Sequence, residues 1–86
     1  MPATILIVDD ERGQREILQT ILEGERYETT TAAGGQEALA LLDVREFDVI
    51  LTDLKMQGMS GMELLERLLT EDPQQCVIMM TAHGTV

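Results

Sequence analysis

Three aspartates in this chain stand at the ends of apolar runs. Asp9 and Asp10 follow the aliphatic residues 5–8, and Asp53 ends the similar run 48–53. Continuous aliphatic runs of this length are typical of strands covered on both faces of a parallel sheet. Ligands bind at the carboxyl ends of such strands, so the sequence places these carboxylates where a site is expected.

If the strands that carry them are neighbours, about 4.8 Å apart, the three carboxylates meet in one cleft with Thr81, which ends a later run. Like charges this close raise one another's pKa and cost stability unless a cation or a proton offsets them. Mg²⁺ is usually held by one or two carboxylates, with waters and phosphate oxygens as its other ligands. The pattern therefore favours a magnesium and phosphoryl site.

Each of these residues alone has a commoner structural role. An aspartate before a helix is most often an N-cap, and an aspartate after a strand is most often a turn residue. Thr81 is an ordinary residue for a strand end. The joint placement of Asp9, Asp10 and Asp53 is what favours the functional interpretation.

Apolar runs alternate along the chain with segments of helical spacing. This alternation predicts an α/β fold, a parallel sheet with helices on both faces and right-handed crossovers. A helix stop is expected at Gly24, and the strand that follows is polar at alternate positions, as an edge strand would be. The expected order is strand 5–8, helix 11–24, strand 27–32, a helix after Gly34-Gly35, strand 48–53, a helix capped by Ser60 and Glu63, and strand 76–80.

The composition is that of one globular domain over residues 1–86. The net charge of −10 would repel nucleic acid and anionic membranes. No run approaches the ~18 apolar residues of a membrane helix, and no signal peptide is evident, so a cytoplasmic location is expected. The single cysteine, Cys76, is expected in the core, and His83 is expected on the surface.

The motifs at the strand ends resemble the receiver domain of bacterial two-component response regulators. The resemblance rests on Asp9-Asp10, on Asp-Leu-Lys-Met at 53–56 followed by Gly-Met-Ser-Gly at 58–61, and on Thr81-Ala82. It covers the whole chain. The ending at 80–86 is most like receivers of the nitrogen-regulatory, sigma-54 activator type.

The resemblance implies a flavodoxin-like, CheY-like fold and a set of site residues. Asp53 would be the phosphoacceptor. Asp10, Asp53 and the backbone carbonyl of Lys55 would bind Mg²⁺, and Asp9 would act through a metal-bound water. Phosphoryl transfer needs positioning and charge neutralisation more than covalent help, and a divalent ion beside the acceptor supplies both.

The remaining site residues and the partners also follow from the resemblance. Thr81 would offer its hydroxyl to the phosphoryl group, and the small Ala82 would leave room for it. The chain would be a signalling module and not an enzyme, taking a phosphoryl group from a sensor histidine kinase onto its own Asp53. It would switch an output domain, expected to activate transcription.

The sequence departs from the family pattern in two ways. Gln57 stands where receivers commonly have proline, and a more mobile loop with an intact site is expected there. The family's fold has five strands and five helices, so residues 1–86 are expected to be a receiver truncated after the fourth strand. The fifth strand's phosphate-binding lysine and the aromatic switch residue are then absent, and the strand at 76–80 is expected to self-associate.

The receiver interpretation has three alternatives. A flavodoxin-like cofactor-binding domain needs a Gly/Ser/Thr-rich loop after the first strand, where this chain has Asp9-Asp10-Glu11. A magnesium-dependent phosphatase needs two aspartates at alternate positions, and here they are adjacent. A receiver-derived fragment without phosphorylation activity stays open.

Overall fold

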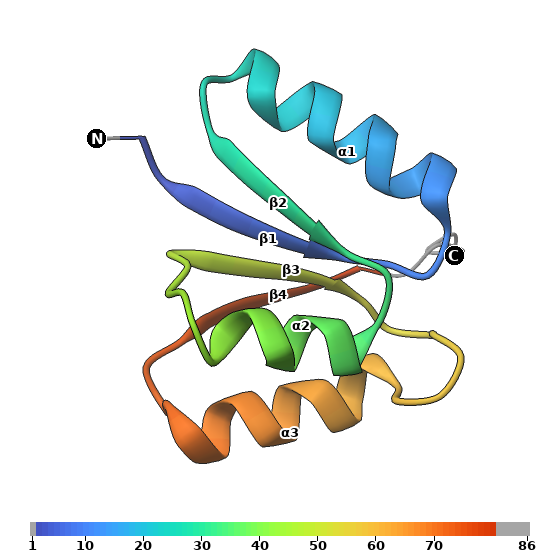
Figure 1. The fold of residues 1–86 in the computed structure, drawn as a ribbon, viewed down its shortest axis with the longest axis vertical. Helices are drawn as coiled ribbons and strands as arrows, with labels where there is room; N and C mark the ends of the chain where they lie inside the picture. Colours follow the sequence, from blue (N-terminus) through green and yellow to red (C-terminus); the bar gives the residue numbers. More distant parts are fainter. Residues whose placement is uncertain (1, 81–86) are drawn as a thin grey trace.

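The computed structural model describes residues 2–80 as a four-stranded parallel sheet with three helices. Helix α1 covers one face of the sheet, and α2 and α3 lie on the other (Figure 1). The elements are β1 (Thr4–Val8), α1 (Arg12–Gly24), β2 (Glu28–Ala32), α2 (Gly35–Leu42), β3 (Val49–Asp53), α3 (Gly61–Glu71) and β4 (Cys76–Met80). The expected α/β alternation is confirmed.

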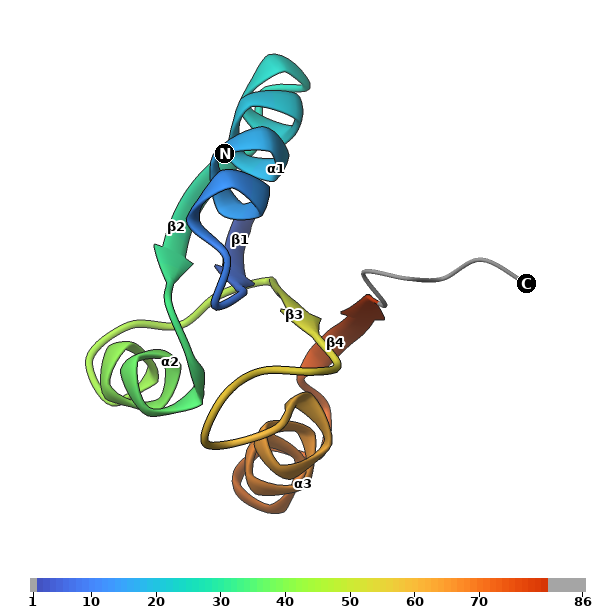
Figure 2. The same cartoon turned by 90° about the vertical axis from the view of Figure 1, so that its right-hand side faces the viewer.

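The strand order is β2-β1-β3-β4, which makes β1 and β3 the central strands and β2 an edge strand, as predicted. The register pairs Val8 with Thr52 and Asp53 with Met80. The strands therefore end together, and the residues that follow them meet at one edge of the sheet. Figure 2 shows the helices on opposite sides of the sheet.

The main core lies between the sheet and helices α2 and α3. Alternate residues of the central strands point into it, because successive side chains of a strand face opposite sides. Its buried members are Leu6, Val8, Ala32, Ala38, Phe47, Ile50, Met59, Leu64 and Leu68. Ile5 and Ile7 are buried as well and alternate with these residues along β1, so they face α1. No helix within residues 2–80 is long and apolar enough to cross a membrane.

Helix α1 ends at Gly24 as expected, but the left-handed residue after it is Arg26, with φ of 70°. The Tyr27 N–H donates to the Leu22 carbonyl, and the Arg26 N–H donates to the Glu23 carbonyl. These two bonds form the Schellman arrangement, whose left-handed position favours glycine. The glycine in this sequence therefore lies two residues before the position that a glycine would suit best.

Helix α3 begins where the sequence predicts. The Ser60 hydroxyl accepts a hydrogen bond from the Glu63 N–H at 3.2 Å, which is one half of the expected capping box. Gly61 follows as the first helical residue, and its N–H donates to the Leu54 carbonyl at 2.9 Å. This bond ties the start of α3 to the chain that leaves β3.

The prediction that Cys76 lies in the core is wrong, because the cysteine is exposed. Cys76 and Ile78 alternate with Val77, which packs against the core on the α3 side. They therefore point to the opposite face, where α1 lies over β1 and β2 at the far side of the sheet (Figure 1). Ile78 is half exposed for the same reason. Self-association through this strand stays a prediction.

Candidate functional site

The three predicted carboxylates lie together at the carboxyl edge of the sheet. Oxygens of Asp9, Asp10 and Asp53 all fall within 4.8 Å of one another. Asp9 is 2% exposed and Asp53 is 6% exposed, whereas Asp10 is open to solvent. The site is therefore a small acidic cluster that is closed at its base and accessible from the Asp10 side.

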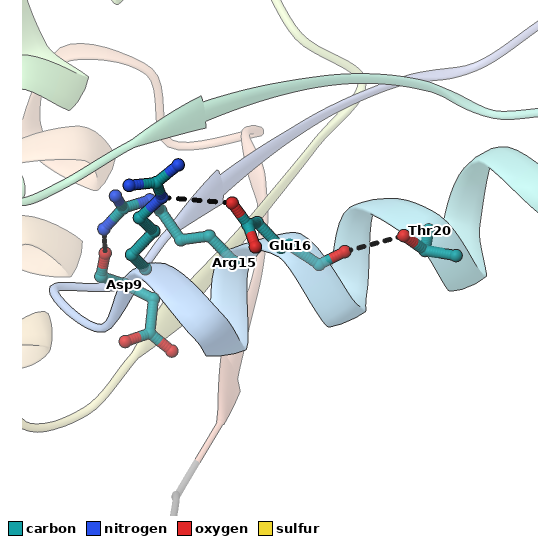
Figure 3. Close-up of polar contacts among 5 residues, drawn as sticks. Asp9, Arg15, Glu16 and Thr20 are labelled. Carbon is teal, nitrogen blue, oxygen red and sulfur yellow. Dashed lines mark hydrogen bonds and ion pairs between the residues drawn. The ribbon is translucent and has the colours of Figure 1, made fainter.

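Asp9 is held by hydrogen bonds to three parts of the chain. Its N–H donates to the Ala32 carbonyl at 3.1 Å, and its Oδ1 accepts from the Glu11 N–H at 2.9 Å. Its carbonyl accepts from Nη1 of Arg15 at 2.7 Å, and Figure 3 shows this arginine reaching back from α1. Asp9 is thus fixed in place although it lies beside two other carboxylates.

The pKa of Asp9 is raised above its ordinary value. Burial is the main cause, and the negative charges of Asp53, Asp10 and Glu11 add to it. The hydrogen bond from the Glu11 N–H acts in the opposite direction. The protein therefore holds the ionised form of Asp9 at a cost in free energy when no cation is bound.

Asp53 ends β3, and the loop that follows folds back around it. The Lys55 N–H lies 3.4 Å from Oδ1 of Asp53, and the Leu54 N–H donates to the Met80 carbonyl at 2.9 Å. The Lys55 backbone is thus beside the cluster. The ligand role of its carbonyl stays a prediction.

Asp10 contacts the same loop from the other side. Its Oδ2 accepts a hydrogen bond from the backbone N–H of Gln57 at 3.0 Å. The loop at residue 57, for which greater mobility is expected, is therefore attached to the site by a bond across 47 positions of the chain.

Thr81 and Ala82 follow β4, and both lie outside the described residues, as does His83. The residue before them, Met80, is aligned with Asp53 in the sheet. Their predicted roles stay predictions.

The donor set fits a hard divalent cation. It consists of oxygen atoms only, and soft metals would require cysteine or histidine ligands. Within residues 2–80 the one ion pair joins Arg12 and Glu16, at 3.1 Å, and involves none of the three aspartates. Arg15 contacts only the backbone carbonyl of Asp9, and no side-chain cation among the described residues pairs with the three carboxylate groups, so a bound ion would supply the missing positive charge.

Replacing Asp9 with asparagine is expected to raise the free energy of unfolding at pH 7 in Mg²⁺-free buffer. The amide removes the buried charge, and its oxygen still accepts from the Glu11 N–H. Because the pKa of Asp9 is raised in the folded state, ionisation of Asp9 lowers the free energy of unfolding as the pH rises from the unfolded-state pKa of about 3.9 through the folded-state pKa.

The gain should therefore shrink as the pH falls to about 3, where Asp9 is protonated in both states. Urea unfolding at a series of pH values measures the difference between the two proteins. A gain that persists unchanged at the acidic end would show that its cause is not the charge of Asp9.

One family model and several known proteins match this chain along most of its length. The family described as response regulator receiver domain matches residues 5–86. Transcriptional regulatory protein GlrR of Escherichia coli is 38% identical over 85 residues, which are 99% of this chain and 19% of that protein. NtrC of Salmonella typhimurium is 39% identical over 93% of this chain and 17% of its own length. These two matches confirm the resemblance to receivers of the nitrogen-regulatory type.

A shorter relative is covered more fully. Sporulation initiation phosphotransferase F of Bacillus subtilis is 42% identical over 98% of this chain and 68% of that protein. This chain thus spans about two thirds of the short relative and less than a fifth of the two transcriptional regulators.

Solved structures agree with the sequence matches. The response regulator TrrA of Thermotoga maritima, in complex with Mg²⁺-BeF, superposes with a TM-score of 0.92 at 36% identity, over 98% of this chain and 72% of that one. A complex of the histidine kinase ThkA with TrrA gives a TM-score of 0.90 at 35% identity, over 99% of this chain and 72% of that one. The fold, the acidic cluster and the sequence matches agree, and the chain belongs to the response regulator receiver domain family.

Proposed function

We propose that this receiver accepts a phosphoryl group on Asp53 from a sensor histidine kinase in the cytoplasm and thereby switches an output domain that activates transcription. The observation that carries the proposal is the cluster of Asp9, Asp10 and Asp53 within 4.8 Å at the carboxyl edge of the sheet. The kinase complex of TrrA and the transcriptional relatives support the two partners.

Asp53 is the best placed of the three carboxylates to be the acceptor. It belongs to a central strand, so the sheet fixes its backbone. The hydrogen bond described for its carboxylate, from the Lys55 N–H, is 3.4 Å long, whereas the bond from the Glu11 N–H to the Asp9 carboxylate is 2.9 Å long. In the transfer, an Asp53 oxygen attacks the phosphorus of the phosphohistidine. The P–N bond breaks, its electron pair stays on the imidazole, and an acyl phosphate forms on Asp53.

The other residues prepare the site for this transfer. Asp10, Asp53 and the Lys55 carbonyl would hold Mg²⁺, with Asp9 contacting it through a water. When bound, the ion neutralises negative charge on the carboxylates and on the incoming phosphoryl oxygens. The family resemblance extends the proposal to Thr81 as a hydroxyl donor to the phosphoryl group and to Ala82 as the small neighbour.

Treatment with acetyl phosphate and Mg²⁺ is expected to add one phosphoryl group to the wild-type chain, as read by intact mass. Asp53→Asn should lose this adduct, because an amide oxygen is a far weaker nucleophile than a carboxylate oxygen. Asp43→Asn, at the exposed end of α2, is the matched control and should react like the wild type. An adduct that forms on Asp53→Asn at the wild-type rate, or no adduct on the wild type, would contradict the proposal.

A further inference from the structure

The Asp10 carboxylate has an anchor that depends on a backbone donor from a distant loop. Asp9 is buried and makes hydrogen bonds to three parts of the chain, and Asp53 is buried at the carboxyl end of the central strand β3. Asp10 is exposed, and within the described residues one hydrogen bond holds its carboxylate, from the Gln57 N–H to Oδ2 at 3.0 Å. The Gln57 side chain is itself exposed, so the contribution of this residue to the site is its main chain.

An exposed aspartate samples several side-chain rotamers when nothing holds it. A hydrogen bond to one carboxylate oxygen selects one rotamer and leaves the other oxygen free for a ligand. Hydrogen-bond partners of this kind orient metal ligands, and their loss commonly lowers metal affinity by roughly ten- to a hundredfold. The Gln57 N–H occupies this position for the most exposed of the three carboxylates.

We propose that the backbone N–H of Gln57 is a positioning group for Mg²⁺ binding, which holds Asp10 towards Asp9 and Asp53 and couples the loop after β3 to the ion. This inference rests on the proposed function, because it assumes that the cluster binds Mg²⁺. Proline lacks the N–H, so a proline at this position cannot make the contact. This chain can therefore make the contact because residue 57 is glutamine and not proline.

The test compares two substitutions that differ in whether the N–H is kept. Gln57→Pro removes the donor, and Gln57→Ala keeps it while removing the exposed side chain. Mg²⁺ is titrated into each 86-residue chain while the amide resonances of residues 9, 10 and 53 are followed by NMR. We expect Gln57→Ala to bind like the wild type and Gln57→Pro to bind roughly tenfold more weakly.

Proline also restricts Met56 and fixes the φ angle of residue 57, so a further variant isolates the donor. In this variant, made by chemical ligation, an ester oxygen replaces the N–H of residue 57 and the side chain is unchanged. The ester should show the same loss of Mg²⁺ affinity as the proline variant. The free energy of unfolding of each protein in Mg²⁺-free buffer separates a loss of affinity from a general loss of structure.

The outcomes distinguish this inference from the function on which it rests. If the wild type binds Mg²⁺ and the ester variant binds it equally well, the positioning role is wrong and the magnesium site stands. If Gln57→Ala loses as much affinity as the ester, the side chain is responsible and the inference is overturned. If residues 9, 10 and 53 of the wild type do not respond to Mg²⁺, both the site and the inference fail.

Discussion

Replacing Gly61 with alanine is expected to lower the free energy of unfolding by about 3 kcal/mol. A Cβ at this position would overlap the carbonyl oxygen of Asp53 and would lie 2.9 Å from Cα of Leu54. Both are backbone atoms, so relief requires that the start of α3 move away from the end of β3. That movement also strains the bond from the Gly61 N–H to the Leu54 carbonyl.

Urea unfolding of Gly61→Ala measures this loss, and Gly13→Ala is the matched control. Gly13 also lies in the first turn of a helix, but a Cβ there meets no atom within 4 Å. Alanine at position 13 should therefore be neutral or should stabilise the protein by up to about 1 kcal/mol. Equal effects of the two substitutions would show that the contact with Asp53 is not the cause.

Truncating Leu64 to alanine is expected to cost about 3 kcal/mol, within the range for fully buried leucines. Leu64 is 0% exposed and anchors α3 in the core beneath the central strands. For a chain of 86 residues, total stability is roughly 4 to 13 kcal/mol, so this one side chain accounts for a large part of it.

The matched control for Leu64 is Leu69 on the same helix, which is 37% exposed. Leu69→Ala leaves a smaller cavity and should cost less than about 1 kcal/mol. The midpoints of urea unfolding, at an unchanged slope, give both values. A loss for Leu69→Ala as large as that for Leu64→Ala would mean that α3 is held by its whole apolar stripe and not by its buried residue.

The elements and the acidic cluster could be predicted from the sequence because both depend on residue type and position along the chain. Aliphatic runs specify the buried strands, and in a parallel sheet the residues after those strands meet at one edge. The proximity of Asp9, Asp10 and Asp53 follows from these two facts. The one additional assumption was that the strands before Asp9, Asp53 and Thr81 are neighbours, and the order β2-β1-β3-β4 confirms it.

The contacts that the sequence did not predict involve the main chain. Arg15 donates to the carbonyl of Asp9, and the Gln57 N–H donates to Asp10. Backbone carbonyl and N–H groups occur in every residue type except proline, which lacks the N–H, so residue type does not reveal these contacts. The one signal for Arg15 is a basic residue in the first two turns of the helix that follows two aspartates. The exposure of Cys76 depends on how far α1 extends across the sheet, which no local pattern records.

The left-handed residue at Arg26 has a related explanation. Gly24 and Arg26 are two residues apart, and a glycine near the end of an apolar stripe favours a stop at that point. The position of the left-handed residue depends on which carbonyls accept hydrogen bonds from the N–H groups of Arg26 and Tyr27. Those bonds depend on how β2 enters the sheet, and that is a tertiary property.

The hydrogen bonds of Asp9 have a consequence for how the protein opens. The N–H of Asp9 is bonded to the last residue of β2, and its carbonyl is bonded to Arg15 in α1. If α1 leaves the sheet in a partial unfolding event, the peptide group that carries Asp9 loses one of its anchors. Detachment of helix α1 is therefore expected to loosen Asp9, which would keep its bond to the end of β2 but lose its link to Arg15.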